Sequence, residues 1–260
     1  MRAAQGTECV AALPGGGVLL LGRSGVCVKL SILIPLYNEA ATIEELLTKV
    51  MATALPQGVE REVVVVDDGS SDGSADIVRK LKKAELVFVQ HPRNAGKGAA
   101  LRTAIRHATG EIGLIQDADL EYDMADYPQL LAPLLNGSAD VVYGSRFASQ
   151  RGRPVHFSLH RFVNRSLTSL SNCFSRLSIT DMETCYKAFR IEIVRDLNLR
   201  ENGFGIEVEL TLKFGRRGVR VVEVPISYKG RSASEGKKLR PLRDGLGALR
   251  CMLRYGFSLS

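Results

Sequence analysis

Glu111-Ile-Gly-Leu-Ile-Gln-Asp117-Ala-Asp119-Leu-Glu121-Tyr122 is the segment that decides the fold expected for this chain. Its first half is a short apolar run, too short for a typical helix, and predicts a buried strand. Its second half has three carboxylates where that strand should end. In an open parallel sheet, ligands bind just outside the carboxyl ends of the strands. The segment therefore predicts a strand that carries acidic side chains to a ligand-binding edge.

The spacing of Asp117 and Asp119 is that of a candidate metal site. Two residues apart on an extended chain, their side chains point the same way. Two such oxygen donors can share one hard cation, Mg²⁺ or Mn²⁺, which keeps some of its waters and takes further ligands from a diphosphate. An Asp-x-Asp after an apolar run also forms a solvated turn or a helix cap, so the spacing alone leaves both interpretations open.

The composition is that of a soluble globular protein. The chain has 260 residues, 45% hydrophobic and 24% charged, enough for one large α/β domain or a domain with an appendage. Its net charge of +7 fits a nucleic acid, an anionic membrane surface or a phosphorylated substrate equally well. The five cysteines include no Cys-x-x-Cys pair, so we expect neither a disulfide framework nor a zinc site, and a reducing cytosol is the default.

The first residues give little indication of structure. No apolar run approaches the roughly 20 residues of a transmembrane helix. The nearest candidate, from Cys9 to Leu21, is interrupted by Pro14 and three glycines, which also argues against a signal peptide. We expect residues 1–28 to be a loosely ordered tail, residues 29–240 to form the main domain, and residues 241–260 to form a basic amphipathic helix.

Strands and helices alternate from Lys29 onward, which predicts an α/β fold with a Rossmann-like, mostly parallel sheet and helices on both faces. Four of the five strand ends up to Phe147 carry polar or charged groups that could face one crevice. Expected strands are 29–35, 61–67, 86–89, 111–116, 141–147 and 219–228, and expected helices include 44–51, 127–135, 160–174, 206–214 and 242–257.

Several residues at these strand ends are candidates for ligand binding. Asp68 could accept hydrogen bonds from a nucleobase or a ribose, or act as a helix N-terminal acid, a role that Asp72 fits better. The loop before Lys97 fails the Walker A pattern, because Gly98 stands where Ser or Thr should bind Mg²⁺. It could still neutralise a phosphate, or be a tight turn. Arg146 is either a surface arginine or a phosphate clamp.

Downstream, two further features allow two interpretations each. Asp181 could be a helix cap or part of a site. The basic run from Lys229 to Arg243 is either a solvated loop or a cationic loop for a diphosphate. The four histidines show no metal spacing, so we expect them to be structural or to lie at the surface.

Taken together, these motifs resemble family 2 glycosyltransferases of the GT-A fold, most closely the dolichyl- and polyprenyl-phosphate mannose or glucose synthases. The resemblance covers Lys29 to Lys238, and five or more motifs stand in the family's order. They are Ile34-Pro-Leu-Tyr-Asn-Glu39, Val-Val-Asp67-Asp68-Gly-Ser-Ser-Asp72-Gly, Asn94-Ala-Gly-Lys97-Gly, Asp117-Ala-Asp119-Leu-Glu121, Gly144-Ser-Arg146-Phe147, Thr180-Asp181 with Tyr186-Lys187, and Glu223-Val-Pro225 with Arg231 and Lys237-Lys238.

The resemblance implies a role for each candidate. Asp119, Arg146 and Asp181 would carry catalysis, with Asp181 as base or orienting carboxylate. Asp117, Asp119 and Glu121 would hold Mg²⁺ or Mn²⁺. The nucleotide sugar would be bound by Pro35, Tyr37, Glu39, Asp68, Lys97, Asp117, Arg231 and Lys237 or Lys238, and the acceptor phosphate by Arg146, Arg161 and Arg165.

The implied reaction is an inverting transfer of a hexose from GDP-mannose, UDP-glucose or a similar donor to a polyprenyl or dolichyl phosphate. A phosphate monoester is already ionised near neutrality, with a second pKa of about 6, so a strong base is not essential. The alternatives are a GT-A transferase with a glycan or protein acceptor and a nucleotidyltransferase. We do not expect a nucleic-acid partner, because 6% aromatic content and no Trp provide few stacking platforms.

A lipid acceptor implies contact with a membrane surface. The chain lacks the C-terminal membrane spans of one branch of the family, so a membrane-anchoring partner is one expectation. The other is that the basic helix from Leu242 to Phe257 lies in the headgroup plane, and ordinary packing against the sheet is its alternative. The expected location is the cytoplasm, with peripheral attachment to the cytoplasmic face of the membrane.

Overall fold

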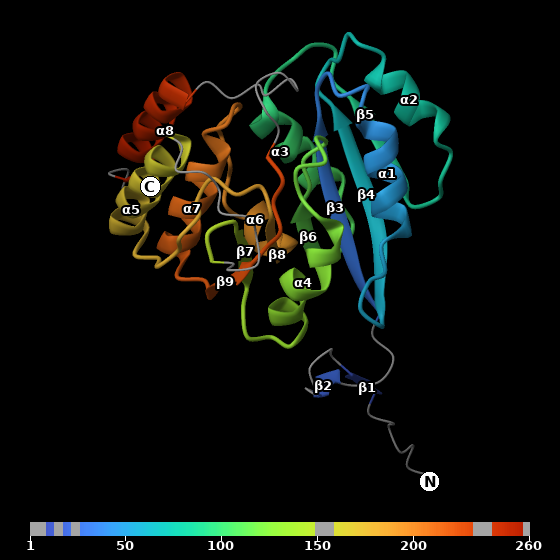
Figure 1. Ribbon diagram of the computed structural model, residues 1–260, viewed down its shortest axis with the longest axis horizontal. Coiled ribbons are helices and arrows are strands. Elements are labelled where there is room, and N and C mark those ends of the chain that lie inside the picture. The colour runs from blue at the N-terminus through green and yellow to red at the C-terminus, as the bar shows by residue number, and fades with distance from the viewer. Residues whose placement is uncertain (1–8, 13–17, 22–26, 149–158, 231–240, 257–260) are drawn as a thin grey trace.

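The computed structural model describes residues 9–12, 18–21, 27–148, 159–230 and 241–256, with side chains from 27–148, 162–230 and 247–256. A seven-stranded sheet runs through its centre in the order β5-β4-β3-β6-β8-β7-β9, with helices on both faces (Figure 1). The strands are β3 (Val28–Leu36), β4 (Val59–Asp67), β5 (Leu86–Gln90), β6 (Ile112–Ile115), β7 (Val141–Ser145), β8 (Lys187–Arg190) and β9 (Val221–Pro225). The mostly parallel α/β sheet predicted from the sequence is confirmed.

The helices connect these strands in the expected alternation. They are α1 (Ile43–Ala52), α2 (Ser74–Lys80), α3 (Lys97–His107), the short 3₁₀ helix η1 (Met124–Asp126), α4 (Tyr127–Leu135), α5 (Leu159–Ser175), α6 (Ile191–Arg195), α7 (Ile206–Arg217) and α8 (Pro241–Gly256). Each helix expected from the apolar spacing is present within three residues of its predicted bounds.

The sheet is buried on both faces where its inner strands carry consecutive apolar residues, most clearly in β4. Val63 to Val66 are completely buried, and alternate valines point to opposite faces. Val63 and Val65 pack in one core with α1, α2 and α4, while Val64 and Val66 pack in a second core with α3, α6, α7 and α8. The four consecutive valines thus specify a central strand between two layers of helices.

β8 departs from the parallel pattern and was not predicted. It runs antiparallel to β6 on one side and to β7 on the other. Its four residues, Lys187 to Arg190, include two basic side chains and do not show the apolar run of a buried parallel strand. Since β6 and β7 are both antiparallel to β8, they run in the same direction as each other.

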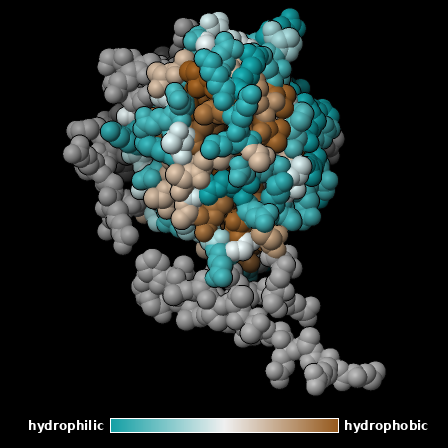
Figure 2. Space-filling view, turned by 90° about the vertical axis from the view of Figure 1, so that its right-hand side faces the viewer, coloured by the Kyte–Doolittle hydropathy of each residue, from teal (hydrophilic) through white to brown (hydrophobic). Residues whose placement is uncertain are grey.

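β5 forms one edge of the sheet. Its residues Leu86 to Val89 are partly exposed, in contrast to the fully buried valines of the neighbouring β4. Figure 2 views the side of the molecule that bears α1, α2 and this edge, where hydrophobic residues (brown) show between hydrophilic ones (teal).

The structure also describes parts of both terminal segments. Within residues 1–28, β1 (Cys9–Ala12) and β2 (Val18–Leu21) pair as a separate antiparallel two-stranded sheet. α8 buries Ala248, Cys251 and Met252 in the core shared with α7. It therefore packs on α5 and α7, in the core that covers one face of the sheet. Among the helices described, none is long and apolar enough to cross a membrane.

Candidate functional site

The carboxyl ends of β3, β4, β6 and β7 lie at the same edge of the sheet, because these four strands run in one direction. The segments that follow them carry Tyr37, Asp68, Asp117 and Arg146. Polar and charged side chains from distant parts of the sequence are thereby collected along one edge, where open α/β sheets bind ligands.

Asp68 holds the loop that follows β5. Its carboxylate accepts hydrogen bonds from Gly96 N at 2.7 Å and Ala95 N at 3.0 Å. His91 Nδ1 lies 2.6 Å from Asp68 Oδ1 and donates to it, while His91 Nε2 lies 2.9 Å from Thr103 Oγ1. His91 is therefore structural, as expected, and Asp68 fixes the start of α3. Its contact with a nucleobase stays a prediction.

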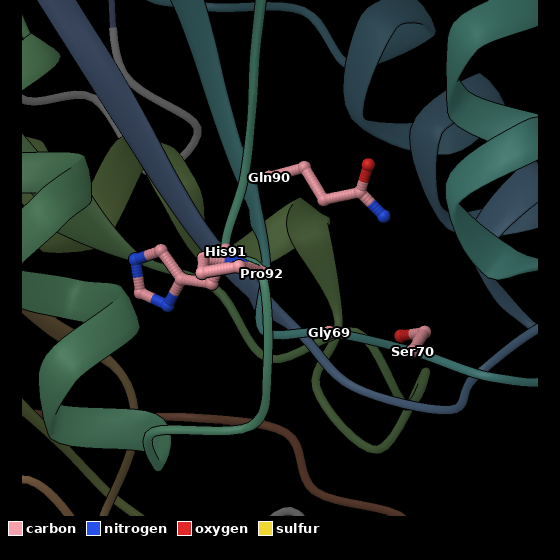
Figure 3. Close-up of a pocket in the computed structure, with 5 residues that line it drawn as sticks. All are labelled: Gly69, Ser70, Gln90, His91 and Pro92. Carbon is pink, nitrogen blue, oxygen red and sulfur yellow. The ribbon is translucent and has the colours of Figure 1, made fainter.

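A cavity of about 360 Å³ lies beside this loop. It is lined by Gly69 and Ser70 after β4 and by Gln90, His91 and Pro92 at the end of β5. In Figure 3 the Gln90 and Ser70 side chains extend to one side of the two loops and the His91 ring to the other. It is a shallow hollow that is largely open to solvent, in contrast to the enclosed clefts that usually hold small molecules.

The residues predicted to line a nucleotide pocket lie at the end of β3, next to the loop after β4. Pro35 is paired with Val66 in the ladder, and Tyr37 is 39% exposed just beyond it. Glu39 accepts a hydrogen bond from Thr42 Oγ1 at 3.1 Å through its carboxylate, and its backbone N donates to Ser74 Oγ. The structure brings these residues to the same edge as Asp68, and their ligand contacts stay predictions.

Lys97 connects α3 to the acidic motif. Its ammonium lies 2.9 Å from Asp117 Oδ1 and 2.9 Å from Cys185 Sγ, and the Cys185 thiol also contacts Asp117. Glu207 Oε1 lies 3.3 Å from the same ammonium. Burial opposes the charged form of Lys97, but Asp117 and its other neighbours hold the Lys97 pKa above its ordinary value. Lys97 is therefore a fixed cation at the end of β6.

The acidic motif itself is only partly assembled. Asp117 and Asp119 are partly exposed, and Asp119 Oδ1 accepts from Glu121 N at 3.2 Å. Glu121 Oε2 instead accepts from the Tyr228 hydroxyl at 2.5 Å. Across the described chain, no three His, Cys, Asp or Glu side chains are grouped as metal ligands.

A divalent cation nevertheless fits Asp117 and Asp119. Mg²⁺ is usually bound by one or two carboxylates, with waters and substrate phosphates completing its coordination. Asp117 and Asp119 are two partly exposed carboxylates two residues apart, and a cation bound there would replace the contacts of Asp117 with Lys97 and the Cys185 thiol. Glu121 is engaged by Tyr228, and its metal role stays a prediction.

Arg146 and Asp181 form a buried ion pair beside the acidic motif. Arg146 Nε and NH2 donate to the two Asp181 oxygens at 2.7 and 2.8 Å, and Asn164 Nδ2 donates at 2.9 Å. Asp181 is completely buried. Burial opposes its ionisation, but the Arg146 charge and these hydrogen bonds hold the Asp181 pKa below its ordinary value. An ionised carboxylate with both oxygens engaged suits the orienting role better than that of a base.

The Arg146 guanidinium also stacks on aromatic rings. It lies 5.1 Å from the centroid of Tyr228 and 5.7 Å from that of Phe147, within the range of cation–π contacts. Tyr228 thus touches both Glu121 and Arg146. It joins the acidic motif to the cationic side of the edge.

The remaining predicted cations are less well defined. Arg165 is exposed on α5, one residue from the buried Asn164 that contacts Asp181. Arg161 lies in the first turn of α5, and its side chain is outside the described residues, as are Arg231, Lys237 and Lys238. Lys229 N donates to Glu121 O at 2.8 Å, so the described chain before Arg231 lies alongside the acidic motif.

Three buried charged residues near the site were assigned no role from the sequence, namely Lys187, Glu207 and Glu209. The Lys187 ammonium, completely buried, pairs with Glu207 at the start of α7. Glu207 and Glu209 lie in a mostly apolar run of one helix. Residues two apart on a helix point to nearly opposite sides, so both glutamates could not face solvent. That pattern could have identified them as paired acids. The Glu209 carboxylate accepts hydrogen bonds from the backbone N–H groups of Arg200 and Glu201, and it pairs with Lys213 at 2.7 Å.

With this geometry in hand, the model of the family described as Glycosyl transferase family 2 matches residues 31–197. The chain belongs to glycosyl transferase family 2. It is 34% identical over 215 residues to the glycosyltransferase AglJ of Haloferax volcanii, covering 82% of this chain and 67% of that protein. It is 30% identical over 214 residues to the dolichol-phosphate mannosyltransferase of Pyrococcus furiosus, covering 81% and 59%.

A solved structure supports the GT-A fold of this family 2 glycosyltransferase. Glucosyl-3-phosphoglycerate synthase from Mycobacterium tuberculosis, in complex with Mn²⁺, UDP and glucosyl-3-phosphoglycerate, has a TM-score of 0.63 at 21% identity. The match covers 88% of this chain and 80% of that one. The same synthase was also solved with Mg²⁺ and UDP. At this identity the likeness shows the fold alone.

Proposed function

We propose that the chain transfers a hexose, with inversion, from a nucleotide sugar such as GDP-mannose or UDP-glucose to a polyprenyl phosphate. The observation that carries the proposal is the juxtaposition of two groups at one sheet edge. Asp117 and Asp119 follow β6, while Arg146 follows β7 and pairs with Asp181, which lies between α5 and β8. The two aspartates suit a metal-bound donor diphosphate, and the Arg146 guanidinium, fixed by Asp181, offers a positive charge to an acceptor phosphate.

The chain's own residues divide the work. Asp117 and Asp119 would hold Mg²⁺ or Mn²⁺, which when bound offsets the charge that builds on the leaving diphosphate. Lys97, fixed by Asp117 and Cys185, adds a second positive charge on the same side. Asp181 keeps the Arg146 guanidinium in one orientation through two hydrogen bonds. The loops after β3, β4 and β5, with the cavity between Ser70 and Gln90, would bind the nucleoside.

The lipid acceptor has support from sequence relatives. AglJ, named a glycosyltransferase, and the dolichol-phosphate mannosyltransferase are similar over about four fifths of this chain. An undecaprenyl-phosphate 4-deoxy-4-formamido-L-arabinose transferase of Edwardsiella ictaluri is 29% identical over 211 residues. This chain spans 67% or less of each of these relatives, so their activities come to it as proposals.

The test is a transfer assay with separate acceptors. Purified protein is incubated with Mn²⁺, a radiolabelled nucleotide sugar and either polyprenyl phosphate or a water-soluble acceptor such as phosphoglycerate, and the mixture is extracted with organic solvent. We expect label in the organic phase only with polyprenyl phosphate. Label that is transferred only to the soluble acceptor would refute the lipid assignment. A thermal-shift screen of GDP-, UDP- and dTDP-sugars would identify the donor base.

We also propose peripheral attachment to the cytoplasmic face of a membrane. α5 and α8 pack against each other, and they expose the apolar side chains of Phe162 and Leu253, 63% and 52% exposed. Arg165, Arg250 and Arg254 are exposed on the same helices. Apolar and cationic side chains together suit an anionic bilayer surface. Sedimentation with anionic but not neutral vesicles is the expected result, and no sedimentation with either would refute the attachment.

A further inference from the structure

Glu183 lies in the turn before β8, and its side chain has an unusual environment. Its Oε1 atom is buried and has no hydrogen-bond partner among the described residues. Native proteins pair nearly all buried polar atoms, so an unpaired one calls for a specific explanation. A ligand that supplies the missing partner is one such explanation.

The backbone on both sides of Glu183 is fixed. The buried Lys187 ammonium donates hydrogen bonds to the backbone oxygens on both sides of it, that of Met182 at 2.9 Å and that of Thr184. Two residues before Glu183, Asp181 pairs with Arg146, and two residues after it, Cys185 contacts Asp117. In the chain, Glu183 therefore lies between a residue that contacts Arg146 and a residue that contacts the acidic motif.

The charges around Glu183 are already balanced. Arg146 is paired with Asp181, Lys187 with Glu207, and Lys97 with Asp117, so three cations face three carboxylates. Glu183 is a fourth carboxyl group with no cation of its own. Burial, followed by the nearby Glu207 charge, raises the pKa of Glu183 to about 7, against smaller opposing effects of Lys187 and Arg146 and with Asp181 adding to the rise.

We propose that Glu183 is neutral in the acceptor complex and donates its carboxyl proton, as a hydrogen bond, to an oxygen of the acceptor phosphate. This inference rests on the proposed phosphate acceptor. A dianionic phosphate in the same crevice as the donor diphosphate would repel an ionised Glu183 and stabilise the neutral acid. A carboxylic acid kept neutral in an apolar site is an effective hydrogen-bond donor to an anion.

The proton stays on Glu183 throughout the transfer. An oxygen of the acceptor phosphate forms the new bond to the anomeric carbon with one of its own electron pairs. The bond between the anomeric carbon and the donor diphosphate breaks, and its electron pair leaves with the nucleoside diphosphate. Glu183 thus acts by binding and orienting the nucleophile, in contrast to a general base, which would have to be ionised at the start.

Two substitutions separate these roles. Glu183→Gln keeps a neutral hydrogen-bond donor, so transfer to polyprenyl phosphate should stay within a few-fold of wild type near pH 7. The wild-type rate should fall about tenfold from about pH 7 to about pH 8.5 as Glu183 ionises, and the Gln variant should lose that decline. Glu183→Ala should lower kcat/KM for the acceptor about 10- to 100-fold, with KM for the donor unchanged.

Controls make the outcomes distinguishable. Glu192→Gln, an exposed change on α6, should match wild type, and thermal unfolding with and without nucleoside diphosphate shows that each variant folds and binds donor. The inference would be overturned if Glu183→Gln lowered the transfer rate 100-fold or more and the wild-type rate rose as the pH increased through 7, because Glu183 would then act as an ionised base. An Ala variant as active as wild type would overturn it too. Absence of lipid product with wild type itself would instead refute the proposed acceptor.

Discussion

Replacing Asp181 by Asn tests whether the Arg146–Asp181 pair organises the cationic side of the site. Asp181 is completely buried, and the Arg146 side chain is only 15% exposed. Removing one charge of a buried pair leaves the other uncompensated, at a cost of about 3–5 kcal/mol. Because Asn keeps one acceptor oxygen for Arg146, we expect the free energy of unfolding to fall by about 3 kcal/mol.

The pair also predicts a dependence on pH. The Asp181 pKa is lowered in the folded state, and a free aspartate titrates at about 3.9. The stabilisation from ionised Asp181 is therefore complete above about pH 4 and is lost as the pH falls through the lower pKa of the folded state. Asp181→Asn should remove this part of the acid dependence, since Asn does not titrate.

Urea unfolding, followed by circular dichroism between neutral and acid pH, measures both effects. Asp76→Asn is the matched control, because Asp76 pairs with Arg79 at the surface, with side chains 69% and 49% exposed, and such pairs contribute little to stability. The transfer rate of Asp181→Asn should fall as well, since Arg146 is no longer held. Equal unfolding midpoints for Asp181→Asn and wild type would refute the reasoning.

Two further substitutions test the framework that supports the site. Phe189→Ala in β8 should lower the free energy of unfolding by about 3–5 kcal/mol, because Phe189 is completely buried and packs on Phe214. Leu253→Ala, at a 52% exposed position, should change the free energy of unfolding little. Equal losses in the two variants would argue against this core. Gly96→Ala should destabilise by about 1–3 kcal/mol, since Gly96 has φ +102° and an added Cβ would lie 2.4 Å from a backbone oxygen. Gly137→Ala is the control, because Gly137 has φ +74° but open space around it, so this change measures the cost of the backbone angle alone. A loss of stability as large as that of Gly96→Ala would show that the close contact has no effect. Urea unfolding measures all four variants.

The sequence predicted the parts of the fold that depend on apolar periodicity. Val63 to Val66 could only be a strand buried on both faces, and α4 begins and ends where the apolar spacing places it, at Tyr127 and Leu135. β8 could not be predicted, because it is short and Lys187 at its start is neutralised by a residue 20 positions away. Its antiparallel direction depends on tertiary contacts with β6 and β7.

The sequence also indicated which residues gather at the site, but not what they bond to. Asp117, Asp119 and Arg146 were identified from their places at strand ends. The Asp68 carboxylate accepts hydrogen bonds from the backbone amides of Ala95 and Gly96. Residue spacing could not predict these bonds, because they depend on how the loop after β5 folds back. Neither could the position of Cys185 beside Asp117.

Binding of Mn²⁺ in the presence of a nucleoside diphosphate tests the central claim most directly. Electron paramagnetic resonance of free Mn²⁺ gives the affinity for wild type, for Asp119→Asn and for Asp123→Asn, an exposed acid two residues beyond the motif. We predict that Asp119→Asn weakens binding by about tenfold or more, while Asp123→Asn matches wild type. Equal Mn²⁺ affinity in all three proteins would contradict the assignment of the acidic motif to a metal-bound diphosphate.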